Sequence, residues 1–344
     1  FHMDAGLYAK FLRTFSEGFG ARRVEGRIVE VLADPASKRI DALKLESGDV
    51  IEGDLFIDCT GFRALLIGQT LGMKYEDWSQ WLHCDSAIAV QTESVGEAVP
   101  YTRSIARQAG WQWRIPLQHR VGNGIVYSSR FWDEAQASQT LLDNIEGTML
   151  TQPRTIRFQP GQRHQTWSGN CVALGLASGF LEPIESTSIH LIQRGIVRLL
   201  QMFPANGISS SDIEEYNRQT SAEIEHIRDF IVLHYHVTSR QDTPFWNTCR
   251  EMEIPASLRH RIELFRETGR VFRVPNELFA ENSWIQVMLG QGILPQQHHP
   301  VADLMGDAEL SQFLDGIRSG IQSTVAKLPS HEAYIRSYCA APQS

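Results

Sequence analysis

Two carboxylates stand three residues apart, at Glu182 and Glu185, in an otherwise apolar stretch of the chain. Ser186-Thr187-Ser188 follows, and its hydroxyl groups can cap a helix that we predict over residues 189–203. The first amide groups of a helix point outwards and carry partial positive charge, so this junction can hold an anion. These residue types indicate either a site for acid–base and anion chemistry or an ordinary, well-capped helix start.

A buried strand and a glycine-rich loop would position this junction. Residues 171–174 form an apolar run typical of a buried strand, and Gly175 and Gly179 then let the backbone approach another group closely. A strand, such a loop and a helix N-terminus together suit an anion or the edge of a flavin, although an ordinary strand–turn–helix has the same pattern. A second short strand, over residues 55–57, ends at Thr60-Gly61, and nucleotides dock at strand ends of this kind in α/β sheets.

Composition and charge narrow the class of protein. The chain has 344 residues, of which 42% are hydrophobic and 21% charged. That is enough for two to three globular domains of roughly 100–200 residues each. The formal net charge of −8 argues against nucleic acid or an anionic membrane surface as the main partner. No stretch approaches the ~18 consecutive apolar residues of a membrane span, and no signal peptide is recognisable, so we expect a cytoplasmic protein.

Neither the cysteines nor the histidines predict a metal site. The five cysteines are odd in number and have no metal-ligand spacing, which favours a reduced, cytosolic protein. His234 and His236, or the pair His298-His299, could in principle bind a metal. No cysteine or carboxylate is spaced to complete either set of ligands, so we expect core or surface histidines and no metal.

The remaining hydrophobic patterns predict an α/β (α+β) protein. A helix capped by Asp4 and a hairpin that turns at Ser47-Gly48 precede the strand at residues 55–57. The next hundred residues are β-rich, with Gly122-Asn-Gly124 expected as a hairpin turn, and the end of the chain is mainly helical. We therefore expect three units: residues 1–61 with 169–203 as a nucleotide-binding domain, residues 62–168 as a second sheet, and residues 204–344 as a helical domain.

One predicted strand places two tryptophans on the same face. In Trp111-Gln-Trp113-Arg-Ile115-Pro116 the residues alternate, so Trp111, Trp113 and Ile115 share one side of the strand. Such a face lines either a ligand pocket or, more commonly, the core between two sheets.

Several segments together resemble the flavin-dependent tryptophan halogenases. Residues 111–116 are similar to the WxWxIP motif that distinguishes this family from flavin hydroxylases, and residues 175–187 resemble its second flavin-contacting segment. Asp58-Cys-Thr-Gly-Phe62 is similar to a strand end that the family shares with single-component flavin monooxygenases. Residues 242–246 and 290–295 resemble further family positions, so the resemblance extends over essentially the whole chain.

The resemblance implies a flavin-monooxygenase-like FAD-binding domain with an inserted β-rich sheet and a helical substrate region. It implies a reaction in which reduced FAD (FADH2), supplied by a separate flavin reductase, combines with O2 to form a flavin hydroperoxide. A chloride or bromide ion attacks that group and gives hypohalous acid, which halogenates an electron-rich aromatic substrate such as indole or a tryptophan-like compound. The oligomeric state stays open between a monomer and a homodimer.

Position by position, the resemblance assigns Glu185 as the active-site glutamate. Its expected tasks are to stabilise the cationic ring intermediate, orient the oxidant and take up the ring proton, which suit a carboxylate in a dry pocket. Glu182 could serve in its place, and a purely electrostatic role at the helix start is the structural alternative. The residues expected to contact the substrate are Trp111, Trp113, Ser186 and Trp284.

The resemblance also assigns residues to the halide and to the flavin. The backbone amides of Thr187 and Ser188 match the halide-binding positions, although many family members have glycine in place of Ser188. The positions expected to contact the flavin are Ile28, at its adenine end, and Gly61, Gly175, Leu176 and Ile189.

The sequence departs from the family pattern in two places. The family begins with a GxGxxG strand–loop–helix that holds the FAD pyrophosphate, followed by an active-site lysine, and neither is recognisable here. We therefore expect the 344 residues to be the C-terminal majority of a longer enzyme. In the second place, two tyrosines that grip free tryptophan in the family are replaced by Asn282-Ser283-Trp284, which favours indole or another electron-rich arene.

Two other functions stay open from the sequence. One is a flavin monooxygenase that hydroxylates an aromatic compound, against which Trp111, Trp113 and Glu185 argue. The other is a non-catalytic flavin-binding protein, which the unrecognised GxGxxG segment favours. In each case we expect a small aromatic ligand and no nucleic-acid or membrane partner.

Overall fold

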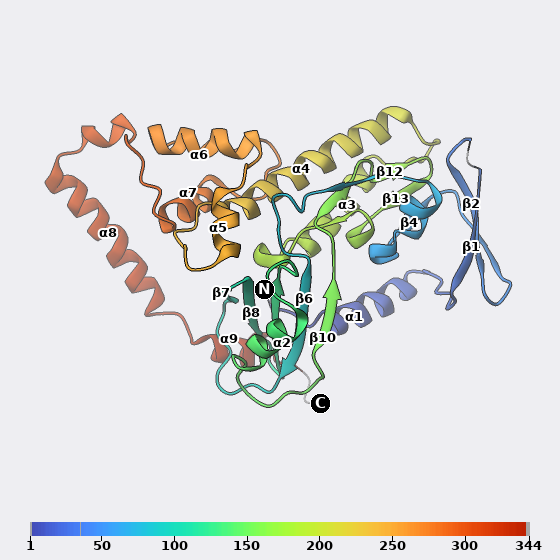
Figure 1. The fold of residues 1–344 in the computed structure, drawn as a ribbon, viewed down its shortest axis with the longest axis horizontal. Coiled ribbons are helices and arrows are strands. Elements are labelled where there is room, and N and C mark those ends of the chain that lie inside the picture. Colours follow the sequence, from blue (N-terminus) through green and yellow to red (C-terminus); the bar gives the residue numbers. More distant parts are fainter. Residues whose placement is uncertain (1, 35, 342–344) are drawn as a thin grey trace.

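A computed structural model describes residues 2–34 and 36–341, and in that part of the chain nine α-helices accompany four small sheets (Figure 1). The architecture is mixed helix and sheet, as the sequence predicts. The strands come from the first half and the middle of the chain, and the helices of residues 244–325 lie together on the left of the view (Figure 1).

Strands from two distant parts of the chain form the sheet beneath the predicted site. β4 (Phe56–Asp58) lies parallel to β13 (Cys171–Ala173), which pairs antiparallel with β12 (Trp167–Ser168). Cys171 and Ala173 pack into one apolar cluster and Val172 into another, because successive side chains of a strand point to opposite faces. Both faces of this small sheet are therefore covered, and β13 is completely buried.

The first elements of the chain match the sequence-based expectation. Asp4 caps α1 (Ala5–Gly18) by accepting hydrogen bonds from the amides of Gly6 and Leu7. An antiparallel sheet follows, with strands in the order β1 (Ile28–Asp34), β2 (Arg39–Leu45) and β3 (Val50–Glu52). The hairpin between β2 and β3 turns at Gly48, whose φ of 91° suits glycine.

The β-rich segment forms an antiparallel sheet of five strands, in the order β10-β6-β9-β8-β7. The strands are β6 (Ser86–Thr92), β7 (Arg103–Arg107), β8 (Gly110–Pro116), β9 (Val121–Tyr127) and β10 (Arg154–Arg157). A smaller sheet joins this segment to the site region, with β11 (Gly161–Arg163) between β5 (Tyr75–Asp77) and β14 (Gly179–Phe180).

Helix α4 (Ser210–His236) is the central helix of the mainly helical second half of the chain. It contacts α3 (Ser188–Gln201), α5 (Pro244–Glu251), α6 (Ala256–Thr268) and α7 (Glu281–Gly290). Its second half is almost entirely buried and shares one large apolar core with the five-stranded sheet. The last helices, α8 (Asp307–Val325) and α9 (His331–Tyr338), have no buried residue, and α8 stands away from the body (Figure 1).

Two local expectations were wrong, and one helix was not expected. Gly122 and Gly124 lie inside β9 instead of in a hairpin turn, and the chain reverses between Leu117 and Arg120. The β-rich segment also contains a helix, α2 (Glu134–Leu142), which begins at a capping box formed by Asp133 and Gln136. No hydroxyl side chain caps α3, whose N-cap is Thr187.

Two general features of the described residues bear on function. None of their helices is both long enough and apolar enough to cross a membrane. They also contain no group of three or more histidine, cysteine, aspartate or glutamate side chains that could hold a metal ion.

The packing of Trp113 explains the glycine inside β9 and gives a first prediction. A β-carbon on Gly124 would overlap the Trp113 ring and lie 2.6 Å from the carbonyl oxygen of Ile88. We expect Gly124→Ala to lower the free energy of unfolding by about 1–3 kcal/mol, because the ring must move out of its place in the packed sheet.

Gly122 provides the matched control for this substitution. It lies on the same strand, and a β-carbon there would meet only the Ile115 carbonyl oxygen, at 3.8 Å. Urea unfolding of both alanine variants should show a large decrease in the free energy of unfolding for Gly124→Ala only. Equal midpoints for the two variants would contradict the packing argument.

Candidate active site

The carboxyl ends of β4 and β13 meet at one edge of their sheet. Each strand runs into a 3₁₀ turn that begins with a glycine, Gly61 with a φ of 74° and Gly175 with a φ of 62°. The buried carboxylate of Asp58 fixes this edge, because it accepts hydrogen bonds from the amides of Leu66 (2.9 Å) and Ile67 (2.8 Å). The two glycines therefore present backbone, without side chains, on a rigid edge.

Exposed apolar side chains surround this edge. Phe62, Leu176 and Ile189 are 43%, 39% and 40% exposed. Apolar surface of this kind gains free energy when a flat apolar ring covers it. The backbone at Gly61 and Gly175, together with these side chains, thus fits the edge and face of a flavin.

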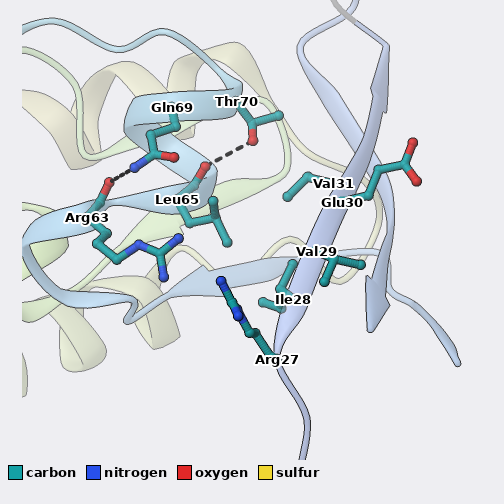
Figure 2. A pocket seen from close by; sticks show the side chains of 9 residues that line it. All are labelled: Arg27, Ile28, Val29, Glu30, Val31, Arg63, Leu65, Gln69 and Thr70. Atoms are coloured by element: carbon teal, nitrogen blue, oxygen red, sulfur yellow. Dashed lines mark hydrogen bonds between the residues drawn. The ribbon is translucent and has the colours of Figure 1, made fainter. Parts of the chain in front are cut away.

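A cavity of about 390 Å³ lies nearby, between β1 and residues 63–70 (Figure 2). Ile28 is one of its lining residues, as are Leu65 and Val31. Arg27 and Arg63 extend their guanidinium groups towards the same space from opposite walls (Figure 2). The remaining lining side chains are both polar and apolar. A cavity of this kind with two arginines suits a nucleotide, because arginine binds phosphate oxygens in a bidentate manner.

The segment that carries the two glutamates makes a tight turn into α3. Pro183 to Glu185 form a 3₁₀ turn, and Ser186 follows with the left-handed dihedral angles φ 53° and ψ 39°. This conformation is costly for a residue with a β-carbon, and it reverses the chain so that α3 can begin at Ser188. Among the described residues, the amides of Thr187 and Ser188 donate no hydrogen bond, so two free donors lie at the helix N-terminus.

Glu185 pairs with a histidine from the middle of the helical half. Oε1 of Glu185 lies 2.9 Å from Nε2 of His234, a residue of α4. The Glu185 side chain is 30% exposed and the His234 side chain 18% exposed, so the pair stands at the rim of the protein interior. The carboxylate is accessible to a small molecule while one of its oxygens is held.

Glu182 has the opposite environment. It is 1% exposed, and neither carboxyl oxygen has a hydrogen-bond partner in the described residues. Burial raises its pKa from 4.5 to about 7, although the nearby Tyr235 hydroxyl, Cys84 thiol and His234 ring oppose this shift. Tyr235 and Cys84 lie beside the carboxyl group without reaching hydrogen-bonding geometry. Two glutamates three residues apart therefore lie in different environments, with Glu185 the accessible one.

The predicted tryptophan face is present in β8. The ring centroids of Trp111 and Trp113 are 5.9 Å apart, at an interplanar angle of 53°. Trp111 is buried in the large core with 3% of its surface exposed, while Trp113 is half-buried. Of the two alternatives, pocket lining and core packing, Trp111 therefore fits core packing. Trp113 keeps an accessible surface.

The other two residues expected at the substrate side lie in different environments. Ser186 is exposed, next to Glu185. Trp284 is only 2% exposed and packs against the Phe230 ring and the Arg261 guanidinium, with the latter 4.0 Å from its ring centroid. A role for Trp284 in substrate binding stays a prediction. In this structure the Trp284 ring packs edge-on against the Phe230 ring.

Three residues of the site region were missed from the sequence. From the sequence His234 is recognisable only as half of a possible metal pair, because its partner Glu185 lies far away in the chain. Arg27 and Arg63 flank predicted flavin residues, but isolated arginines carry no motif. A prediction that residues 55–57 and 171–174 form paired strands would also place Arg63 near the site. No local sequence pattern indicates His234.

The model of a family described as tryptophan halogenase matches residues 1–307 of this chain. The chain is 34% identical to the tryptophan 6-halogenase SttH of Streptomyces toxytricini, with 97% of this chain and 65% of that protein covered. It is 68% identical to the solved structure of Xcc4156, a flavin-dependent halogenase from Xanthomonas campestris, with a TM-score of 0.98 over 99% of this chain and 69% of that one. For BrvH, a flavin-dependent halogenase from Brevundimonas sp. BAL3, the identity is 46% and the TM-score 0.95, over 98% of this chain and 69% of that one. The chain spans about two thirds of the length of these proteins.

The burial of Glu182 predicts how stability depends on pH. Since its pKa is about 7 when folded and near 4.5 when exposed, the unfolded chain loses this proton first as the pH rises. Glu182 therefore lowers the free energy of unfolding progressively as the pH rises above about 4.5, by about 3 kcal/mol at pH 8. Glu182→Gln should remove this loss, so the variant should exceed the wild type in stability at pH 8 and nearly match it at pH 5.

Urea unfolding at pH 5 and pH 8 measures this effect. Glu214→Gln, at an exposed position of α4, is the control and should change the pH dependence little. If Glu182→Gln and the wild type lose the same stability between the two pH values, Glu182 does not hold its proton in the folded protein.

Proposed function

This chain belongs to the tryptophan halogenase family, and we propose that it supplies the active site of a flavin-dependent halogenase acting on electron-rich aromatic compounds. The observation that carries this proposal is the start of α3. There the accessible Glu185 carboxylate, two free backbone amides and the glycine-lined edge of the β4–β13 sheet come together. This combination suits an anion, a flavin and a reacting aromatic ring within one small region.

The cofactor is expected to be FAD in its reduced form, delivered by a separate flavin reductase. When bound, reduced FAD with O2 and a chloride or bromide ion supplies hypohalous acid, the electrophile of the reaction. Leu176 and Ile189 would cover the flavin ring, Ile28 and the two cavity arginines would hold the nucleotide end, and the amides of Thr187 and Ser188 would hold the halide.

Glu185 would act directly on the substrate. An aromatic ring that accepts a halogen cation becomes positively charged, and a partly buried carboxylate stabilises that charge more strongly than water does. The carboxylate can then take the proton that the ring must lose. Glu182 is less suited to this task, because it is buried without access to a substrate and keeps a proton up to about pH 7.

The substrate we propose is indole or a similar arene without an amino-acid group. Curated relatives are named as tryptophan halogenases. The family pattern has two tyrosines that grip free tryptophan. This chain has Asn282, Ser283 and the buried Trp284 at those positions, so it offers no phenol groups there to hold an amino acid. We expect the aromatic ring to be recognised by shape and apolar contact, including the accessible face of Trp113.

Product mass tests the proposed reaction. The enzyme with bound FAD, a flavin reductase, NADH, oxygen, indole and either chloride or bromide should yield a product with the isotope pattern of the added halogen. Glu185→Gln should lower the yield about 10²- to 10⁴-fold, because the variant cannot accept the ring proton.

Glu225→Gln is a matched control, since Glu225 lies on α4 and its side chain accepts one hydrogen bond among the described residues, from the Ser221 hydroxyl. It should leave the yield within a few-fold of the wild type. A hydroxylated product that forms without any halide would contradict the halogenase and favour a monooxygenase.

Substrate preference is a separate prediction. The ratio of kcat/KM for indole to that for free tryptophan should exceed ten, since unpaired charges of the amino-acid group would meet no partner in the site. A higher kcat/KM for free tryptophan would contradict this substrate assignment while leaving the halogenase proposal in place.

A further inference from the structure

His234 connects the Glu185 carboxylate to the backbone of α4 through both of its ring nitrogens. Nδ1 lies 2.7 Å from the carbonyl oxygen of Phe230, and Nε2 lies 2.9 Å from Oε1 of Glu185. A carbonyl oxygen can only accept a hydrogen bond, so Nδ1 carries a proton. The geometry thereby determines the tautomer of the ring.

With the proton on Nδ1, the contact between Nε2 of His234 and Oε1 of Glu185 shows whether a further proton is present. A neutral imidazole with its proton on Nδ1 presents only a lone pair at Nε2, and a carboxylate oxygen likewise only accepts. Two acceptors do not approach each other to 2.9 Å without a hydrogen between them. The contact between His234 and Glu185 must therefore contain one shared proton.

Aromatic packing holds the imidazole in this orientation. The Phe230 ring meets the His234 ring edge-on, at 4.9 Å between centroids and 84° between planes. Phe230 is itself stacked on Phe279 at 3.9 Å and touches Trp284. The ring is thus fixed by packing on one side and by the Phe230 carbonyl on the other, so Nε2 points at Glu185.

We propose that His234 is a positioning residue that holds Oε1 of Glu185 through a proton on Nε2, leaves Oε2 for the substrate, and lets the pair act first as an acid and then as a base. The inference rests on the halogenase function proposed above. As hypohalous acid transfers its halogen, the halogen–oxygen bond breaks, a carbon–halogen bond forms, and the shared proton converts the departing hydroxide into water. The ring carbon then loses its proton to the carboxylate, its electron pair returns to the ring, and the pair regains one proton. The sum is arene plus hypohalous acid giving haloarene plus water.

The groups around the pair are compatible with this role. Besides Glu185, Glu182 is a titratable neighbour of His234, and Tyr235 and Cys84 lie beside Glu182. Burial holds Tyr235 and Cys84 in their neutral forms, since it raises the pKa of both groups well above their ordinary values. Glu182 gains negative charge only above about pH 7.

Nitrogen NMR of the histidine rings tests the proton directly and requires no activity. In the FAD-bound enzyme with ¹⁵N-labelled histidine, we expect both ring nitrogens of His234 to be protonated at pH 7; a His234→Asn spectrum identifies the signal. In Glu185→Ala, Nδ1 should stay protonated and Nε2 should lose its proton. A neutral His234 in the wild type, or a proton missing from Nδ1, would overturn the inference.

Two substitutions separate positioning from simple packing. His234→Gln keeps an N–H donor near the Nε2 position, so its yield of halogenated indole per flavin oxidised should stay within a few-fold of the wild type, with a flatter pH profile. His234→Leu keeps the bulk but removes the donor and should lower that yield about 10- to 100-fold, while FAD binding and oxidation of reduced FAD stay unchanged.

His226→Leu is the matched control, because His226 lies on the same helix and makes no hydrogen bond or ion pair within the described residues. Wild-type yield from His234→Leu, or equal losses in His234→Leu and His234→Gln, would overturn the positioning role. If the wild type itself gives no halogenated product, the proposed function fails, and the NMR spectra still decide whether His234 carries the proton.

Discussion

The parallel pairing of β4 with β13 is the contact on which the candidate site depends. These two short strands come from segments separated by the whole five-stranded sheet, and their hydrogen bonds bring two glycine turns to one edge. Asp58 accepts amide hydrogen bonds at that edge and holds the first turn in place, while the buried residues of β13 anchor the second. The chain leaving the second turn then leads directly to the glutamates and to the start of α3.

The two glutamates of the candidate site differ in their environments. Glu182 and Glu185 are chemically identical and three residues apart, yet one is enclosed by apolar groups and a thiol and the other faces solvent and an imidazole. The 3₁₀ turn from Pro183 to Glu185 separates the two side chains, because it changes the direction of the backbone between them. Depending on its surroundings, a carboxyl group can thus be a reserve of protons or an accessible base.

Local pattern was sufficient for most elements and for the site segment, but contacts between distant residues were not predictable from it. The cap at Asp4, the turn at Gly48 and the strand over residues 171–174 each follow from short-range chemistry, and each is present. Gly122 and Gly124 suggested a turn because glycine is common there. The reason for Gly124 is the Trp113 ring lying on it, a contact between neighbouring strands. The same limit applies to His234, whose importance appears only when α4 packs beside the turn at Glu185.

The insertion of a complete sheet between β4 and β13 also has a consequence for how the chain reaches its native state. Closing a long loop costs conformational entropy, and that cost falls when the intervening residues have already become compact. Within the five-stranded sheet, β7, β8 and β9 pair with their neighbours in sequence, whereas β6 pairs with β9 and β10 across longer segments. The strands β4 and β13 are separated in sequence by the whole of this sheet. We therefore expect the edge that carries the candidate site to form late in folding, after the sheet that separates its two strands.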